Sequence, residues 1–170
     1  MRLHALAIAA AAMASATAAL ADPIDPCSLL TSSEMEELGI PKGATPSREL
    51  QPGGVQACRY EGVGTGSTVS VIISQGVPDR ARQLRAMQGL AQREGTAEQL
   101  RARGEYFQGN VMCKVVVTSE TEKSQCLGAT EQSVVGLSVS RAGESKQATS
   151  PALQLRVIGT LVSRVASSGG

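Results

Sequence analysis

The chain has 170 residues, of which 18% are charged and only 2% aromatic, and its formal net charge is +1. So balanced a charge and so few aromatic rings argue against a nucleic-acid-binding domain, which needs a cationic surface and rings on which bases stack. The single histidine is His4, so a Ser-His-Asp or Cys-His catalytic group and a histidine-ligated metal site are not expected in the rest of the chain.

The first 21 residues have the layout of a secretory signal peptide. Arg2 precedes an alanine-rich apolar stretch, and Ala19-Leu20-Ala21 fits the rule of small residues at a cleavage site. The stretch is short for a membrane span. We therefore expect cleavage after residue 21, one domain over residues 22–170 without a membrane span, and a periplasmic or secreted location. Cleavage would remove Arg2, one of 16 basic residues, so the mature chain would have as many basic residues as its 15 acidic ones.

Cysteine usage indicates two disulfides. An even number of cysteines in an exported chain favours pairing, and three connectivities are open for the four residues Cys27, Cys58, Cys113 and Cys126. Their spacing favours the sequential pairs Cys27–Cys58 and Cys113–Cys126. None belongs to a Cys-x-x-Cys unit, which argues against a thioredoxin-like redox role. Cys27 also lacks a preceding lipobox, so no lipid anchor is expected.

The N-terminal part of the mature chain predicts a helix, a loop and a hairpin. A short helix is expected over 27–39, because Thr31 and Glu34 form a capping box and Gly39 provides a left-handed stop. Residues 41–54, rich in proline and glycine, indicate a loop. Two strands, 55–61 and 67–74, should then form a hairpin across the glycine-rich segment 62–66, with apolar residues alternating in the second strand.

The middle of the chain predicts two helices and a candidate interaction surface. Apolar residues at helical spacing, Ala81, Leu84, Met87 and Ala91, favour a helix over 78–93, and Thr96 can cap a second one that ends near 103. Six arginines in this stretch either form a basic surface for an anionic partner or belong to the solvated face of an amphipathic helix. Two aromatic residues follow, which could add a contact surface or fill the core at the start of a strand. The candidate interaction residues are Arg80, Arg82, Arg85, Arg93, Arg101, Arg103, Tyr106 and Phe107.

The C-terminal part predicts a meander and a helix. If Cys113 and Cys126 face each other directly, the turn between their strands is centred between Ser119 and Glu120, and the strands cover roughly 111–117 and 122–128. A third strand is expected over 133–140. A final helix should begin at Pro151 with Ser150 as its cap and one apolar stripe. The expected fold is therefore α+β, an antiparallel sheet of about five strands covered by helices, in the order α-β-β-α-β-β-β-α.

One stretch also resembles a known group of proteins. The run from Asp25 to Glu34, Asp-Pro-Cys-Ser-Leu-Leu-Thr-Ser-Ser-Glu, followed by Cys58-Arg59-Tyr60, resembles the opening of small exported bacterial domains of unknown function, many of them envelope lipoproteins. The likeness covers the first third of the mature chain. It implies a compact α+β domain, Mog1/PsbP-like in architecture, with a first disulfide between Cys27 and Cys58. Membrane attachment is not carried over, because the lipobox is missing.

The remaining chemistry offers few candidates for a catalytic or binding group. No lysine stands three residues after a serine, which argues against a serine–lysine mechanism. The carboxylates Glu34, Glu36 and Glu37 crowd one short helix, where we expect a solvated face. Neither a calcium loop nor a phosphate-binding glycine loop is predicted, because Gly62-x-Gly64-x-Gly66 leads into a strand. No catalytic residue, metal or cofactor is therefore assigned.

Three functions remain in view. The leading interpretation is an exported non-catalytic domain that binds a protein or another envelope component. The alternatives are a carrier of a small apolar ligand held between sheet and helices, and a hydrolase that uses carboxylates alone. A closed core with an exposed apolar or arginine-rich patch would favour the binding domain, whereas a dry cavity lined by valine and methionine would favour the carrier.

Overall fold

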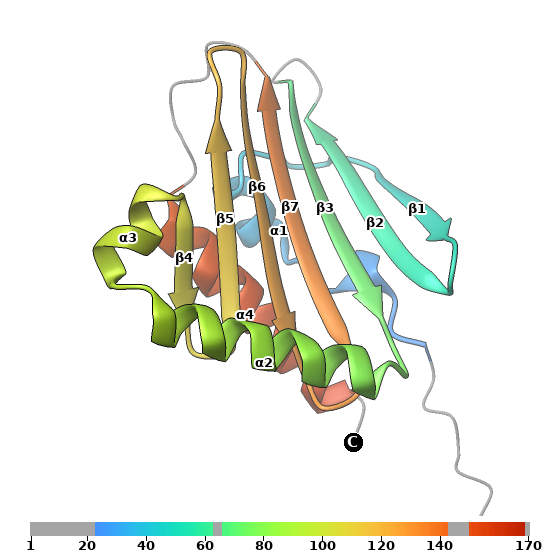
Figure 1. Ribbon diagram of the computed structural model, residues 1–170. Coiled ribbons are helices and arrows are strands. Elements are labelled where there is room, and N and C mark those ends of the chain that lie inside the picture. Colours follow the sequence, from blue (N-terminus) through green and yellow to red (C-terminus); the bar gives the residue numbers. More distant parts are fainter. Residues whose placement is uncertain (1–22, 63–65, 143–149, 169–170) are drawn as a thin grey trace, which may run out of the picture.

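The computed structural model describes residues 23–62, 66–142 and 150–168, and Figure 1 shows their arrangement. The predicted signal peptide, residues 1–21, lies outside the described residues, as do residues 63–65 of the glycine-rich loop. In chain order the elements are η1 (Pro26–Ser28), α1 (Ser32–Glu37), β1 (Pro46–Gln51), β2 (Val55–Gly62), β3 (Ser67–Ser74), α2 (Pro78–Glu94), α3 (Ala97–Ala102), β4 (Glu105–Gln108), β5 (Val111–Val117), β6 (Thr121–Ala129), β7 (Val134–Ala142) and α4 (Pro151–Ser168).

The seven strands of the described residues join one antiparallel sheet in the order β1-β2-β3-β7-β6-β5-β4. The α+β class, with helices on an antiparallel sheet, is confirmed. The expected number of five strands and the expected element order are wrong, because β1 and β4 are added at the two edges. Every residue of β1 is exposed and β4 has only four residues, so neither carries the apolar alternation that marks a half-buried strand.

The two faces of the sheet are covered differently. Helix α4 lies behind the sheet in Figure 1, with α1 on the same side, whereas α2 crosses in front of one end of the strands. Successive side chains of a strand point to opposite faces. Those directed towards α4, such as Val71, Leu137 and Cys126, are no more than 1% exposed and form the main core. We call this side of the sheet the covered face.

A disulfide and several hydrogen bonds hold the N-terminal segment against the covered face. The helix expected over 27–39 is divided into η1 and α1, because Thr31 adopts an extended backbone and caps α1 with Glu34 in the predicted capping box. Cys27 is joined to Cys58 of β2, and the Tyr60 hydroxyl donates to the Cys27 carbonyl at 2.9 Å. Arg141 of β7 donates to the Leu38 carbonyl at 2.9 Å, just where α1 ends. Burial raises the pKa of Tyr60, so its hydroxyl stays a donor at neutral pH.

The hairpin of β5 and β6 confirms the register predicted from the cysteines. Cys113 lies opposite Cys126 and the two form the second disulfide. The strands are connected by a turn in which the Thr118 N–H donates to the Thr121 carbonyl at 2.8 Å. Both disulfides have the sequential pairing that the spacing favours, and such bonds persist in an oxidising compartment outside the cytoplasm.

Helix α4 completes the core. It begins at Pro151, as predicted, and buries seven residues along one side: Gln154, Leu155, Val157, Ile158, Leu161, Val162 and Val165. A Cβ atom at Gly128 of β6 would lie 2.5 Å from Cγ2 of Val162, so glycine is what allows the helix to approach this strand so closely. Within the described residues, no helix is long and apolar enough to cross a membrane.

Candidate functional site

The face of the sheet opposite α4 is covered at one end only. Helix α2 buries Ala81 and Leu84 against Ala129 and Val134, which lie where β6 ends and β7 begins. Beyond this strip no other described helix crosses the face (Figure 1). We call the uncovered part the open face; side chains of β3, β7, β6 and β5 form its centre, and β2 and β4 continue it on the two sides.

A row of apolar residues crosses the open face next to α2. The strand register aligns Met112 of β5, Leu127 of β6, Gly136 of β7 and Ile72 of β3 directly beside one another. Leu127 is 37% exposed, and Met112 and Ile72 are half-buried. The row therefore offers apolar surface that the fold of this chain leaves in contact with water.

The next two rows, farther from α2, consist mostly of polar residues, and the residues at their centre have short side chains. One consists of Lys114, Gln125, Ser138 and Ser70, and the other of Val116, Lys123, Ser140 and Thr68. The central positions, on β3 and β7, carry only serine and threonine. Their short side chains leave the centre of the open face shallow, with longer charged side chains on the β5 and β6 side.

Helix α2 adds two exposed apolar side chains beside the apolar row. Arg85 and Gln92 donate to the carbonyls of Thr130 and Gly109, in the turns at the covered end of the sheet. With about 3.6 residues per turn, Met87 and Leu90 lie on the other side of the helix. These two are 53% and 54% exposed and line a groove of about 520 Å³ with Ala91, Glu94, Arg103 and Glu105. Met87, expected in the helix's apolar stripe, is thus at the surface and not in the core.

Exposed apolar side chains are concentrated around the open face. Six large apolar residues of the described chain are more than a third exposed, and four of them, Met87, Leu90, Val116 and Leu127, lie on the open face or on the side of α2 beside it. The other two, Leu50 and Val117, lie on β1 and at the end of β5. The sequence offers a weak signal for this cluster, because Met112 and Leu127 occupy the outward positions of strands that alternate.

The six candidate arginines do not gather on one surface. Arg85 is held by the Thr130 carbonyl, Arg82 pairs with Asp79 at 3.5 Å, and Arg103 pairs with Glu105 at 3.0 Å. The others are exposed and form no ion pair or hydrogen bond within the described residues; they are Arg80 and Arg93 of α2 and Arg101 of α3. The arrangement matches solvated helix faces better than a basic patch for an anionic partner.

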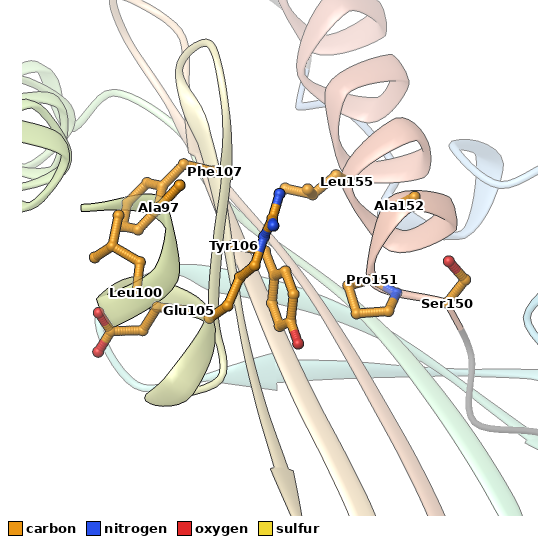
Figure 2. A pocket seen from close by; sticks show the side chains of 10 residues that line it. Ala97, Leu100, Glu105, Tyr106, Phe107, Ser150, Pro151, Ala152 and Leu155 are labelled. Atoms are coloured by element: carbon orange, nitrogen blue, oxygen red, sulfur yellow. The ribbon is translucent and has the colours of Figure 1, made fainter. Parts of the chain in front are cut away.

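The two candidate aromatic residues lie on opposite faces of β4. They line a pocket of about 510 Å³ at the edge of the sheet, between α3 and the start of α4. Figure 2 shows Tyr106 on the side of Pro151 and Phe107 on the side of Ala97 in α3. Both rings are half-buried, so they serve as walls of this pocket and not as a continuous aromatic surface.

The carboxylates of α1 divide into a structural residue and two exposed ones. Glu34 is only 8% exposed, which corrects the expectation of a solvated face, whereas Glu36 and Glu37 are exposed. Burial by itself would raise the pKa of Glu34, but hydrogen bonds from Arg164 at 2.7 Å and from Thr31 outweigh it and lower the pKa below its usual value. A carboxylate held ionised in this way anchors α4 to α1.

The other ionisable groups with a shifted pKa are also explained by structural contacts. The pKa of Asp25 is lowered by the hydrogen bond from Arg48, whose Nη2 lies 2.6 Å from Oδ2 of Asp25. Among the described residues, no three histidine, cysteine or acidic residues lie together in a way that could hold a metal ion. The perturbed groups therefore mark how the N-terminal segment is held, and none lies on the open face.

Comparisons with known proteins do not indicate a function for the chain. No protein-family model matches the chain, and neither a curated protein nor a solved structure is significantly similar to it. The resemblance to small exported envelope domains, and to the Mog1/PsbP-like architecture, stays a prediction.

Proposed function

We propose that the chain is an exported, non-catalytic domain that binds a protein partner through the open face. The observation that carries the proposal is that Met87, Leu90, Val116 and Leu127 are exposed on one side of the molecule. Leu127 belongs to the apolar row beside α2, and Val116 lies two rows farther from the helix. Apolar surface of this kind on a small domain is the usual mark of an interaction site. The partner would meet an apolar strip beside α2 and a polar, serine-rich floor farther out.

The closed core supports this proposal over a carrier function. A carrier would hold its apolar ligand between the sheet and the helices, but the core residues that α4 and the covered face bring together there, such as Val71, Leu137 and Ile158, are no more than 1% exposed. The ionised, hydrogen-bonded carboxylate of Glu34 supports a structural role and not that of a catalytic acid. Two disulfides make a rigid scaffold suited to display a surface in the periplasm or outside the cell.

The mixed charge of the open face also bears on the partner. Lys114 lies 3.9 Å from Glu105 of β4, and Arg59 and Glu61 on the neighbouring strand β2 form an ion pair at 3.0 Å. Lys123 of β6 forms no ion pair within the described residues. This pattern suits a protein surface with apolar and acidic side chains better than a nucleic acid or another polyanion.

Position-specific photocrosslinking tests the proposal. A photoreactive benzoylphenylalanine is placed at Leu127 or at Leu90 in cells that export the protein, and at Leu50 or Val117 as controls, which are 80% and 70% exposed but lie elsewhere. We expect one discrete adduct from the first pair and none from the controls. The captured protein, once purified, should bind the Leu127→Lys variant at least about tenfold more weakly than the unaltered domain, whereas Val117→Lys should bind normally.

Two results would contradict the proposal. Adducts of the same proteins from all four positions would indicate nonspecific contact with any exposed apolar residue. Equal binding of the captured protein by the Leu127→Lys and Val117→Lys variants would place its binding site away from the open face.

A further inference from the structure

Strand β4 is an edge of the sheet, and among the described residues the outer side of its backbone has no partner. Within the described residues it pairs only with β5. The Val115 N–H donates to the Gly104 carbonyl at 2.8 Å, which sets the alternation of hydrogen-bonded positions along this pair of strands. The N–H and C=O groups of Tyr106 and Gln108 therefore face β5, and those of Glu105 and Phe107 point outwards. No described residue forms a hydrogen bond with these outward groups.

These outward groups lie in a pocket and not on a flat edge. The pocket of about 510 Å³ runs along β4 between α3 and the first turn of α4. Its walls are mostly apolar: Leu100 and Ala97 on one side, Pro151 and Leu155 on the other. In Figure 2 the two rings of β4 point to the two walls, Phe107 towards α3 and Tyr106 towards α4. A chain lying here would have side-chain room on both faces of the sheet.

The opposite edge of the sheet differs in each of these respects. Strand β1 starts with Pro46 and carries exposed charges at Arg48 and Glu49, which are common devices against the pairing of edge strands. Strand β4 has no proline and presents two aromatic residues. Of the two edges, β4 is the one left able to accept another strand.

We propose that β4 binds an extended peptide segment of a partner protein, which adds to the sheet as an eighth strand between α3 and α4. Backbone hydrogen bonds to Glu105 and Phe107 would provide affinity, and alternate apolar side chains would enter the pocket beside Tyr106 and Phe107. The charged groups of the pocket wall are Arg101 and Glu105, and Glu105 is already paired with Arg103. The unpaired Arg101 therefore favours a peptide with an acidic residue next to its apolar ones. This site borders the open face, because Phe107 lies beside Met112 in the strand register, but it uses the outer backbone edge of β4, which the open face does not include.

Peptide selection on a matched pair of variants tests the proposal. A phage library of random dodecapeptides is selected on the full mature domain, and the enriched peptides are measured by fluorescence anisotropy on Phe107→Pro and Phe107→Leu. Both variants lose the ring, but only proline removes the outward N–H, and an edge strand tolerates proline at such a position. We expect peptides with alternating apolar residues, and binding at least about tenfold weaker to Phe107→Pro than to Phe107→Leu. Thermal melts establish that both variants fold.

A second measurement does not depend on any variant of the domain. The selected peptide is synthesised with single N-methyl groups at successive positions, and amide hydrogen exchange of Phe107 is followed with and without it. Binding should be abolished in those peptides whose N-methyl group replaces an N–H directed towards β4, which are every second peptide of the series. Bound peptide should also slow the hydrogen exchange of the Phe107 amide. The proposal is overturned if no peptide is enriched, if N-methylation has the same effect at every position, or if peptides bind Phe107→Pro and Phe107→Leu equally. A concentration-dependent dimer in which the Phe107 amide is protected from hydrogen exchange would also overturn the proposal, because the pocket along β4 would then bind β4 of a second copy.

Discussion

The two faces of the sheet differ in how their residues are used. The covered face carries both disulfides, the main core and the ion pair between buried Glu34 and half-buried Arg164, and α4 covers it with seven buried residues. The open face carries small hydroxyl residues, lysines and exposed apolar side chains, and α2 covers only one end of it. We therefore expect most of the free energy of folding to come from the covered face, so that the surface of the open face can change at little cost to stability.

The largest effect is expected from removing the disulfide that holds the N-terminal segment. The double variant Cys27→Ala, Cys58→Ala opens a bridge with a sequence separation of 31 residues, and we expect a loss of about 4 kcal/mol in the free energy of unfolding. Cys113→Ala, Cys126→Ala, with a separation of 13, should lose about 3 kcal/mol. Urea denaturation without reductant measures both losses. Unchanged midpoints in both double variants would show that the covered face does not depend on its disulfides.

A slightly smaller effect is expected from emptying the core under α4. Leu161 is fully buried, and Leu161→Ala should cost about 3 kcal/mol because the neighbouring residues cannot close the cavity completely. Leu90→Ala, at a residue 54% exposed beside the open face, should cost less than about 0.5 kcal/mol. Denaturation of the two leucine variants under one set of conditions gives the comparison. Equal losses would refute the separation of stability between the two faces.

The Glu34 contact should make the covered face sensitive to acid. Because the pKa of Glu34 is lower in the folded than in the unfolded chain, its contribution is present above the usual glutamate pKa of 4.5 and is lost as the pH falls through the lower folded value. Glu34→Gln should cost about 2 kcal/mol at neutral pH, since Arg164 and Thr31 lose a charged acceptor. Unfolding measured from pH 7 to pH 2.5 should show the variant and the original converging at the acid end. A constant difference over the whole range would contradict this assignment.

The smallest effect on stability is expected on the open face itself. Leu127→Lys places a charge at a position 37% exposed, where the long side chain can reach water, so the free energy of unfolding should change by no more than about 0.5 kcal/mol. Differential scanning calorimetry measures this change. A loss of several kcal/mol would mean that the apolar row serves the fold of this chain and not a partner.

Local features of the sequence predicted most elements correctly. Capping boxes at Thr31 and Thr96 mark the starts of α1 and α3, and Pro151 marks that of α4, because helix ends are determined by a few neighbouring groups. The two edge strands were missed for a physical reason. Their pairing uses the backbone alone, so the residues from Pro46 to Gln51 show no apolar period, and Tyr106 and Phe107 look like core residues.

From the sequence alone, the class of the fold could be predicted, the sequential disulfides were favoured over two other connectivities, and the register of β5 against β6 followed if Cys113 faced Cys126. Each of these follows from short-range chemistry: the period of apolar residues, the number of cysteines and the reach of a disulfide. Only the tertiary structure decided that Met87, Leu90 and Leu127 stay in water while Leu161 and Ile158 are buried. The reason is that an apolar residue at strand or helix spacing predicts a buried face, but whether anything covers that face depends on where distant helices pack. Helix α4, with α1 beside it, covers one side, and α2 crosses only the end of the other.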